Sequence, residues 1–202
     1  MNLSEVAKKV TSFKRTPMYK EVKKRLNEFE FERKSHHEWF SEMCFCLLTA
    51  NASAESGIRV QKAIGKGFMD LSPSDLSKKL RALKYRFPNV RAKYITEARK
   101  CHKIKDMIKG MKSIEAREFL VKNVKGLGMK EASHFLRNTG RTDVAIIDRH
   151  ILRIMGHEVK GISKEKYLEI EHELSDLSHL TNTTLAELDL ILWGIQTGKV
   201  LK

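Results

Sequence analysis

Lys130 and Asp148 are the two residues whose types and surroundings best predict chemistry. Lys130 follows Gly126 and Gly128 at the predicted start of a helix, and Asp148 interrupts an apolar segment 18 positions later. A helix start disfavours a cation, so an amine there loses its proton more easily and can attack a carbonyl-level carbon. A carboxylate near a sugar can stabilise the positive charge that develops as a glycosidic bond breaks.

Both residues also have simpler interpretations. Lys130 could be a solvated or phosphate-contacting lysine, as most lysines are. Asp148 could be the N-cap of a helix that carries Ile151, Ile154 and Met155. The run before Asp148 is apolar, so its carboxylate should be partly buried and in need of a partner. The capping role and a catalytic role of Asp148 are compatible.

Gly126 and Gly128 join two predicted helices, residues 113–123 and 129–138. The free N–H groups of a helix start can bind an anion such as a DNA phosphate. Two glycines alone are more often a tight turn between helices. The full pattern is apolar-x-Gly-apolar-Gly-x-x-x-Ala, which is more specific and is formed by Val124, Gly126, Leu127, Gly128 and Ala132.

The composition indicates a polyanionic partner. The net charge is +14 and the pI is about 9.7, which favours nucleic acid. A lysine-rich surface for solubility, or a heat-adapted composition, is the alternative. A membrane is less favoured because no apolar run reaches the ~20 residues of a spanning helix.

The cysteines and the N-terminus predict a cytosolic protein. Cys44, Cys46 and Cys101 form no CxxC pair, which argues against a disulfide framework, a zinc site and an iron–sulfur cluster. The N-terminal sequence MNLSEVAKKV is charged too early for a secretory signal.

The elements that must position these residues are all predicted to be helical. Apolar residues recur at the helical period almost throughout, which predicts an all-α fold of roughly ten helices. Ser72 before Pro73 predicts one helix start, and Thr184 with Glu187 predicts a capping box. A long basic helix is expected from near Asn89 through Ile108, and others from about residue 143 and from Ser163.

The pattern further predicts two helical lobes that share a cleft. One lobe comprises residues 1–45 and 141–202. The other comprises residues 46–140 and ends in a helix–hairpin–helix at about 113–138, at the cleft between the lobes.

The hairpin followed by Lys130 and Asp148 resembles the HhH-GPD superfamily of helix–hairpin–helix DNA glycosylases. The resemblance implies that Lys130 corresponds to the lysine that attacks the sugar C1′, and Asp148 to the assisting aspartate. It also implies that the hairpin holds a monovalent cation, Na⁺ or K⁺, through the backbone carbonyls of Lys122, Val124 and Leu127. This ion would be structural, and no cofactor is expected to be required.

The segment LLTANAS, residues 47–53, resembles the wedge of that superfamily, whose Asn or Gln fills the gap left by a flipped nucleotide. Asn51 is therefore the candidate wedge residue. A simple helix cap is an equally good interpretation of Asn51 from the sequence alone.

The C-terminal sequence WGIQTGKVLK and the lack of a four-cysteine loop narrow the resemblance. Both features are similar to the small archaeal and thermophile-type 8-oxoguanine DNA glycosylase/AP lyases, the second Ogg subfamily. This implies that Trp193 and Phe87 hold the flipped base and that the carboxylate of Lys202 contacts guanine. Without the resemblance, Trp193 would be core packing and Lys202 a frayed end.

The expected function is base-excision repair of double-stranded DNA that contains 8-oxoguanine, by a monomeric bifunctional glycosylase/AP lyase in the prokaryotic cytoplasm, at the nucleoid. The lysine would form a Schiff base and permit β-elimination. Two alternatives stay open: a glycosylase/lyase for oxidised pyrimidines or another purine lesion, and a non-catalytic helix–hairpin–helix DNA-binding protein. The second alternative does not predict Lys130 together with Asp148.

Overall fold

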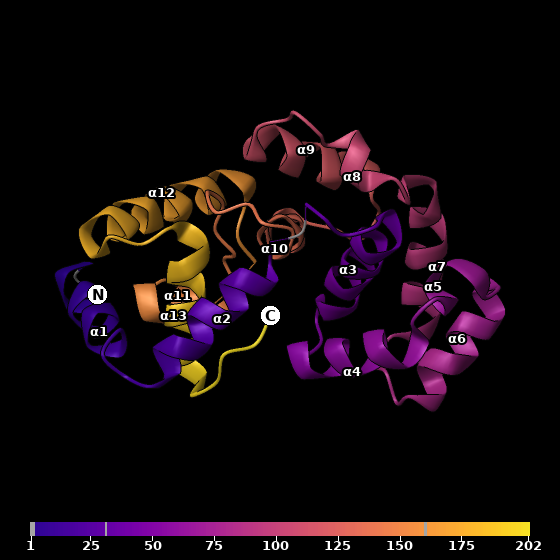
Figure 1. The fold of residues 1–202 in the computed structure, drawn as a ribbon, viewed down its shortest axis with the longest axis horizontal. Helices are drawn as coiled ribbons and strands as arrows, with labels where there is room; N and C mark the ends of the chain where they lie inside the picture. The colour runs from indigo at the N-terminus through magenta and orange to yellow at the C-terminus, as the bar shows by residue number, and fades with distance from the viewer. Residues whose placement is uncertain (1–2, 31, 160) are drawn as a thin grey trace. The chain divides into compact units, whose positions relative to one another are not determined.

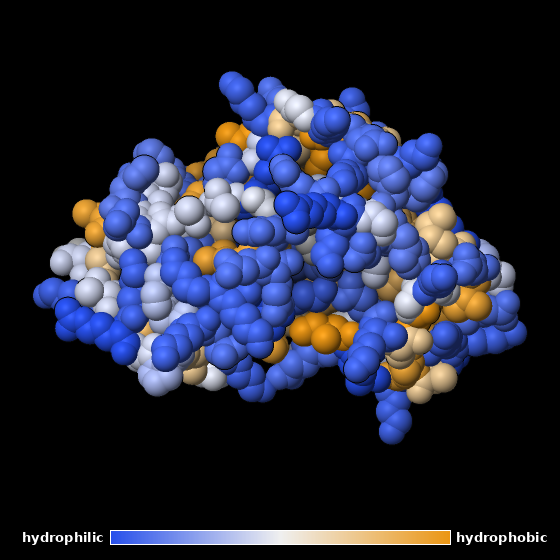
Figure 2. All heavy atoms as spheres, in the orientation of Figure 1, coloured by the Kyte–Doolittle hydropathy of each residue, from blue (hydrophilic) through white to orange (hydrophobic). Residues whose placement is uncertain are grey.

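The structure, a computed structural model, describes residues 3–30, 32–159 and 161–202, and all regular elements in these ranges are helical (Figure 1). Thirteen α-helices and one 3₁₀ helix are present there, which confirms the predicted all-α class and exceeds the predicted number of helices. Hydrophilic side chains cover most of the face shown in Figure 2. Within the described ranges, no helix has the length and apolarity needed to cross a bilayer.

The chain divides into two compact units. The first unit comprises Met1–Glu30 with Leu136–Lys202, and the second comprises Phe31–Phe135. The sequence had predicted divisions after residues 45 and 140. The difference at the first boundary concerns α3 (His36–Thr49), which contacts α4 (Ala54–Ile64), α7 (Pro88–Ala98) and α8 (Ile104–Met107) within the second unit.

In the first unit, α13 (Leu185–Thr197) is the central helix. It contacts four others: α1 (Leu3–Phe13), α2 (Met18–Glu28), α11 (Arg149–Met155) and α12 (Lys164–Thr181). A helix that is buried on nearly all sides should be apolar all round, and α13 buries Leu185, Ala186, Leu188, Leu190, Ile191 and Leu192. Each fully buried leucine or isoleucine contributes roughly 1.5–3 kcal/mol.

The start of α13 only partly matches the predicted capping box. The Thr184 hydroxyl accepts a hydrogen bond from the Glu187 N–H at 3.2 Å, as predicted. The Glu187 carboxylate does not return the bond to Thr184. Instead it accepts a hydrogen bond from the Tyr19 hydroxyl at 2.6 Å and pairs with the Lys23 ammonium at 2.9 Å. A tertiary contact between α13 and α2 has therefore replaced the local one.

In the second unit, the predicted capping residue of α6 (Pro73–Ala82) is confirmed. The Ser72 hydroxyl accepts from the Asp75 N–H at 3.1 Å, and Pro73 occupies the first turn. Around it lie α5 (Gly67–Asp70) and α7, which packs on α6, α5 and α3.

The predicted long helix from Asn89 through Ile108 is wrong. α7 ends at Ala98, a 3₁₀ turn spans Arg99–Cys101, and α8 follows. On one continuous helix, at ~100° per residue, Ile104 would face opposite to Ile95. Both residues are fully buried, so the break lets both side chains reach the core.

α9 (Ser113–Asn123) and α10 (Met129–Asn138) form the predicted helix–hairpin–helix. α10 begins in the second unit and its last residues belong to the first unit. A helix was predicted from about residue 143, but α11 begins only at Arg149. Residues 144–148 before it have no regular secondary structure. The side chains that hold this segment lie on α12.

Candidate active site

The hairpin is built around Gly126, whose φ of +96° lies in the left-handed region. A Cβ at this position would lie 2.5 Å from Cδ2 of Tyr94 on α7, so a glycine is required both by the backbone and by the contact. The Leu127 N–H donates to the Val124 carbonyl at 3.1 Å and closes the turn. Val124 and Leu127 are buried and anchor the hairpin.

Cationic side chains surround Tyr94 beneath this turn. The Arg91 guanidinium carbon lies 5.6 Å from the centre of the Tyr94 ring, and the Lys125 ammonium lies 5.7 Å from it. These are cation–π distances. Lys125 is exposed, so the ring supports a positive charge at the surface of the hairpin.

Gly128 is the N-terminal boundary of α10, since its carbonyl accepts a hydrogen bond from the Ala132 N–H at 2.9 Å. The residue is exposed. The first N–H groups of a helix lack partners within the helix. An exposed start of this kind, next to Lys125, can receive an anion.

Lys130 lies in the first turn of α10, as predicted. Its Nζ is 2.9 Å from Oε1 of Glu131, and the side chains are 33% and 12% exposed, respectively. Glu131 also reaches back toward Gly128, where a Cβ would lie 3.3 Å from its Oε2. The amine thus has an adjacent carboxylate that can accept its proton. The sequence reasoning missed Glu131, although an acidic residue in the first turn of a helix is a visible signal.

Asp148 caps α11, which confirms the capping prediction. Its Oδ1 accepts hydrogen bonds from the His150 N–H at 2.8 Å and the Ile151 N–H at 3.0 Å. The residue is half-buried. Both bonds are made by Oδ1, so the cap uses only one of the two carboxylate oxygens. Asp148 can therefore cap the helix and still present an oxygen to a substrate.

Asp189 of α13 is a buried carboxylate, and its burial together with the negative charge of Asp148 raises its pKa. Asp189 pairs with Arg137 at the end of α10. The Arg137 side chain also donates from Nε and Nη2 to Oδ1 of Asn138 at 3.1 and 2.9 Å. Burial raises the pKa of Asp189 to about 7; Arg137 opposes this shift, and the charge of Asp148 adds to it.

Sequence reasoning also missed this pair. The feature of the sequence that could have indicated the pair is Asp189 itself, the one aspartate among the apolar residues of α13.

Trp193 on α13 is half-buried, and its ring contacts the ring of His150 edge to face, with centroids 6.1 Å apart and an interplanar angle of 69°. His150 follows Asp148 by two positions, so this contact joins Trp193 to the capped end of α11. Lys202 is partly exposed. Asp148, His150, Trp193 and Lys202 all belong to the first unit.

Phe87 and Asn51 belong to the second unit, as do the hairpin and Lys130. Phe87 precedes α7 and is half-buried, with the Arg86 guanidinium carbon 4.9 Å from its ring centre.

Asn51 is exposed and has a φ of +59° directly after the end of α3. Asparagine is among the few residues that tolerate this conformation, so the helix-end interpretation is consistent with the structure.

The end of α3 is held by two side chains from the α7 region. The Tyr85 hydroxyl donates to the Leu48 carbonyl at 2.7 Å, and Nη2 of Arg91 donates to the Ala50 carbonyl at 2.7 Å. Asn51 follows Ala50, so its backbone starts from a fixed point. The exposed Asn51 side chain thus extends from a backbone that these two hydrogen bonds hold.

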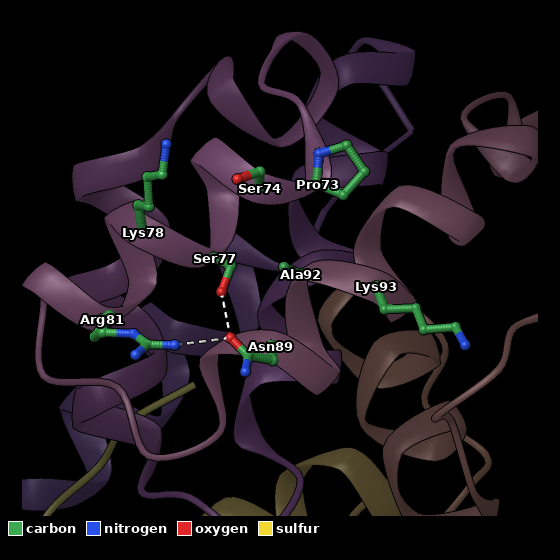
Figure 3. Close-up of a pocket in the computed structure, with 8 residues that line it drawn as sticks. All are labelled: Pro73, Ser74, Ser77, Lys78, Arg81, Asn89, Ala92 and Lys93. Carbon is green, nitrogen blue, oxygen red and sulfur yellow. Dashed lines mark hydrogen bonds between the residues drawn. The ribbon is translucent and has the colours of Figure 1, made fainter.

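A pocket of about 570 Å³ lies between α6 and α7, separate from these residues (Figure 3). Oδ1 of Asn89 accepts from the Ser77 hydroxyl at 2.6 Å and from Nη2 of Arg81 at 3.0 Å. Lys78 and Lys93 also line the pocket. None of the predicted site residues contributes to it. Across the described part of the chain, no cluster of three or more His, Cys, Asp or Glu side chains could hold a metal ion.

The hairpin, with a lysine in the first turn of its second helix, defines a helix–hairpin–helix protein. A family model described as 8-oxoguanine DNA glycosylase (Ogg-HhH) matches residues 22–183. The chain therefore belongs to the 8-oxoguanine DNA glycosylase family.

Curated relatives agree with the family model. The chain is 50% identical to the 8-oxoguanine DNA glycosylase/AP lyase of Methanocaldococcus jannaschii, over 96% of this chain and 98% of that protein. It is 46% identical to the protein of the same description from Thermotoga maritima, over 90% of this chain and 91% of that protein.

Solved structures are also similar. The M. jannaschii glycosylase/lyase in complex with a 15mer DNA containing 8-oxoguanine gives a TM-score of 0.95 at 49% identity, covering 98% of this chain and 100% of that chain. The T. maritima 8-oxoguanine DNA glycosylase gives a TM-score of 0.93 at 43% identity, with all of both chains covered.

Proposed function

We propose that this protein is a bifunctional DNA glycosylase/AP lyase that removes 8-oxoguanine from double-stranded DNA in base-excision repair. The observation that carries the proposal is Lys130 in the first turn of α10, directly after the glycine hairpin, with a carboxylate 2.9 Å away. The names of the relatives and the DNA bound to the M. jannaschii protein support the same activity.

The first step is binding of the DNA backbone. A net charge of +14 favours a polyanion and makes its binding salt-dependent. The exposed start of α10 after Gly126 and Gly128, with Lys125 beside it, would contact one phosphate without reading sequence.

The second step is capture of the lesion. The nucleotide is flipped out of the stack, and Asn51 fills the gap. Phe87 and Trp193 offer aromatic faces to the flipped base. The terminal carboxylate of Lys202 accepts hydrogen bonds from the N–H groups on the Watson–Crick edge of guanine.

The third step is the chemistry. The neutral Lys130 amine attacks C1′ while the bond from C1′ to the base breaks, and the base leaves with the electron pair and takes up a proton. Asp148 stabilises the positive charge that develops on the sugar. Glu131 accepts the proton that the attacking amine loses. The C1′–O4′ bond then breaks, O4′ takes up a proton, and the ring-opened sugar is joined to Lys130 as an iminium (Schiff base). The iminium makes the C2′ proton acidic, so loss of that proton expels the 3′ phosphate by β-elimination, and water finally hydrolyses the Schiff base.

A monovalent cation would fit the hairpin as a further DNA contact. The carbonyls proposed to hold it are those of Lys122, Val124 and Leu127. The Val124 carbonyl already accepts from Leu127, but a carbonyl oxygen has two lone pairs and can still contact an ion. Replacing Na⁺ and K⁺ by tetramethylammonium at constant ionic strength should then weaken DNA binding. Unchanged affinity would argue against the ion.

We further propose that the protein is a monomer and that it acts on DNA in the cytoplasm of a prokaryote. The archaeal and Thermotoga relatives support a prokaryotic setting. Sedimentation of the protein with and without a duplex tests the monomer, since one protein per duplex is expected.

A panel of duplexes with single lesions tests the activity. The expected result is strand incision at 8-oxoguanine, fastest among 8-oxoguanine, oxidised pyrimidines and an undamaged control. Preferred incision at an oxidised pyrimidine would favour the alternative glycosylase. Tight binding without incision of any duplex would favour a non-catalytic DNA-binding protein.

A further inference from the structure

The segment that leads into Asp148 is held by the side chains of α12. The Tyr167 hydroxyl donates to the Ala145 carbonyl at 2.7 Å and accepts from the Ile147 N–H at 3.4 Å. Oε1 of Glu171 accepts from the Ala145 N–H at 2.9 Å. Two side chains thus satisfy three backbone groups of a segment that has no secondary structure of its own.

Tyr167 and Glu171 act from one face of one helix. They lie four residues apart on α12, which places them one above the other. Tyr167 is only 3% exposed, and the four residues 144–147 are at most 7% exposed. Backbone groups buried to this degree need partners. The two side chains are therefore specific partners of this segment and not incidental surface contacts.

α12 also contacts the other end of α11. Nε2 of His157, just after the end of α11, lies 2.9 Å from Oε2 of Glu173. The short helix that Asp148 caps is thus held before its start and after its end by one long helix.

These contacts determine where α11 begins. The apolar pattern alone is compatible with a helix that starts near residue 143, but the backbone of Asp148 is extended, with φ −103° and ψ −179°. An N-cap residue needs such a non-helical conformation. By bonding the backbone of Ala145 and Ile147, α12 keeps these residues from joining the helix.

We propose that Tyr167 and Glu171 are positioning residues, which hold residues 144–147 out of the helix so that the Asp148 carboxylate stays fixed at the start of α11. This inference rests on the proposed role of Asp148 in excision. A misplacement of about 1 Å can cost roughly a hundredfold in rate, so loss of either contact should slow the chemical step and leave DNA binding unchanged.

Single-turnover excision of 8-oxoguanine with enzyme in excess tests the proposal. We expect Tyr167→Phe and Glu171→Ala each to lower the rate about tenfold or more, with an unchanged Kd for the duplex. Glu171→Gln keeps an oxygen acceptor for the Ala145 N–H and should retain most of the rate. Tyr19→Phe is the matched control, because its hydroxyl bonds Glu187, away from this segment.

A double-mutant comparison separates positioning from a general structural role. If the two side chains act through Asp148, Tyr167→Phe should cost little further rate in an Asp148→Asn background. The same loss in both backgrounds would overturn the positioning role. So would a wild-type rate for Tyr167→Phe when Asp148→Asn is slow.

If Asp148→Asn excises at the wild-type rate, the proposed function of Asp148 itself fails. Should Tyr167→Phe not fold, the comparison of Glu171→Ala with Glu171→Gln carries the same test.

Discussion

Lys130, the proposed nucleophile, has a close neighbour that could affect its chemistry, Glu131. In the proposed mechanism the amine loses a proton as it bonds to C1′, and the carboxylate 2.9 Å from its Nζ is in reach of that proton. Glu131 is also the less exposed of the two, so water competes little for its position. The proposed nucleophile and the proposed proton acceptor are therefore adjacent residues of one helical turn.

Glu131→Gln should therefore slow excision of 8-oxoguanine. A general base contributes about 10²–10⁴-fold to a proton transfer, and we expect a loss toward the lower end, because the Lys130 side chain is 33% exposed and water can also accept its proton. The measurement is the single-turnover rate. Glu97→Gln, which removes an exposed carboxylate that pairs with Lys93, is the control. An unchanged rate for Glu131→Gln would mean that the proton goes elsewhere.

The role of a residue could be predicted from the sequence where its partners are close to it along the chain. Asp148 as a helix cap follows from one polar residue before an apolar helix, and it was found. Tyr167 and Glu171 were not foreseen, because their partners lie 22 and 26 positions away. The same holds for Arg137 and Asp189, which are 52 positions apart.

At the scale of elements, the hairpin depends on one glycine more than on the other. Gly126 has a positive φ and faces the Tyr94 ring, whereas a Cβ on Gly128 would meet only a flexible carboxylate. The sequence pattern requires a glycine at both positions and does not distinguish them. Only the tertiary contact with α7 shows that they differ.

Gly126→Ala should destabilise the protein and weaken DNA binding. Gly110→Ala is the matched control, because Gly110 also has a positive φ but a Cβ added there would have no neighbour within 4 Å. We expect the backbone strain of about 1–2 kcal/mol in both variants. The clash should add to it only at Gly126. Urea unfolding and the Kd for duplex DNA measure the two effects, and equal losses in the two variants would contradict the role assigned to Tyr94.

The elements themselves were largely predictable, and their ends were not. Helical periodicity and capping residues identified most helices, including α6 and α10. The break after Ala98 escaped prediction because it depends on which face of the chain Ile95 and Ile104 must bury. The late start of α11 escaped because side chains of another helix bind the preceding backbone.

At the scale of the whole molecule, the buried Asp189 couples stability to pH. Its pKa is raised from 3.8 to about 7 in the folded protein, so the folded state binds this proton more tightly than the unfolded state. Its contribution to stability is complete below about pH 4 and is lost as the pH rises to about 7.

The stability advantage of the wild type over Asp189→Asn should therefore shrink between pH 4 and 7, by up to about 4 kcal/mol. Denaturant unfolding at several pH values measures it. Asp176→Asn, at an exposed position of the same unit, should show no such trend. An advantage that grows with pH would mean that the ion pair with Arg137 outweighs burial.

Covalent trapping tests the central claim for the molecule, that Lys130 attacks the DNA sugar. Borohydride reduction of the reaction with an 8-oxoguanine duplex should link the wild-type protein to DNA, and Lys130→Gln should bind the duplex yet give no adduct. Lys125→Gln, which removes a lysine of the same hairpin, should still be trapped. An adduct of Lys130→Gln equal to that of the wild type, or none from either protein, would contradict the account.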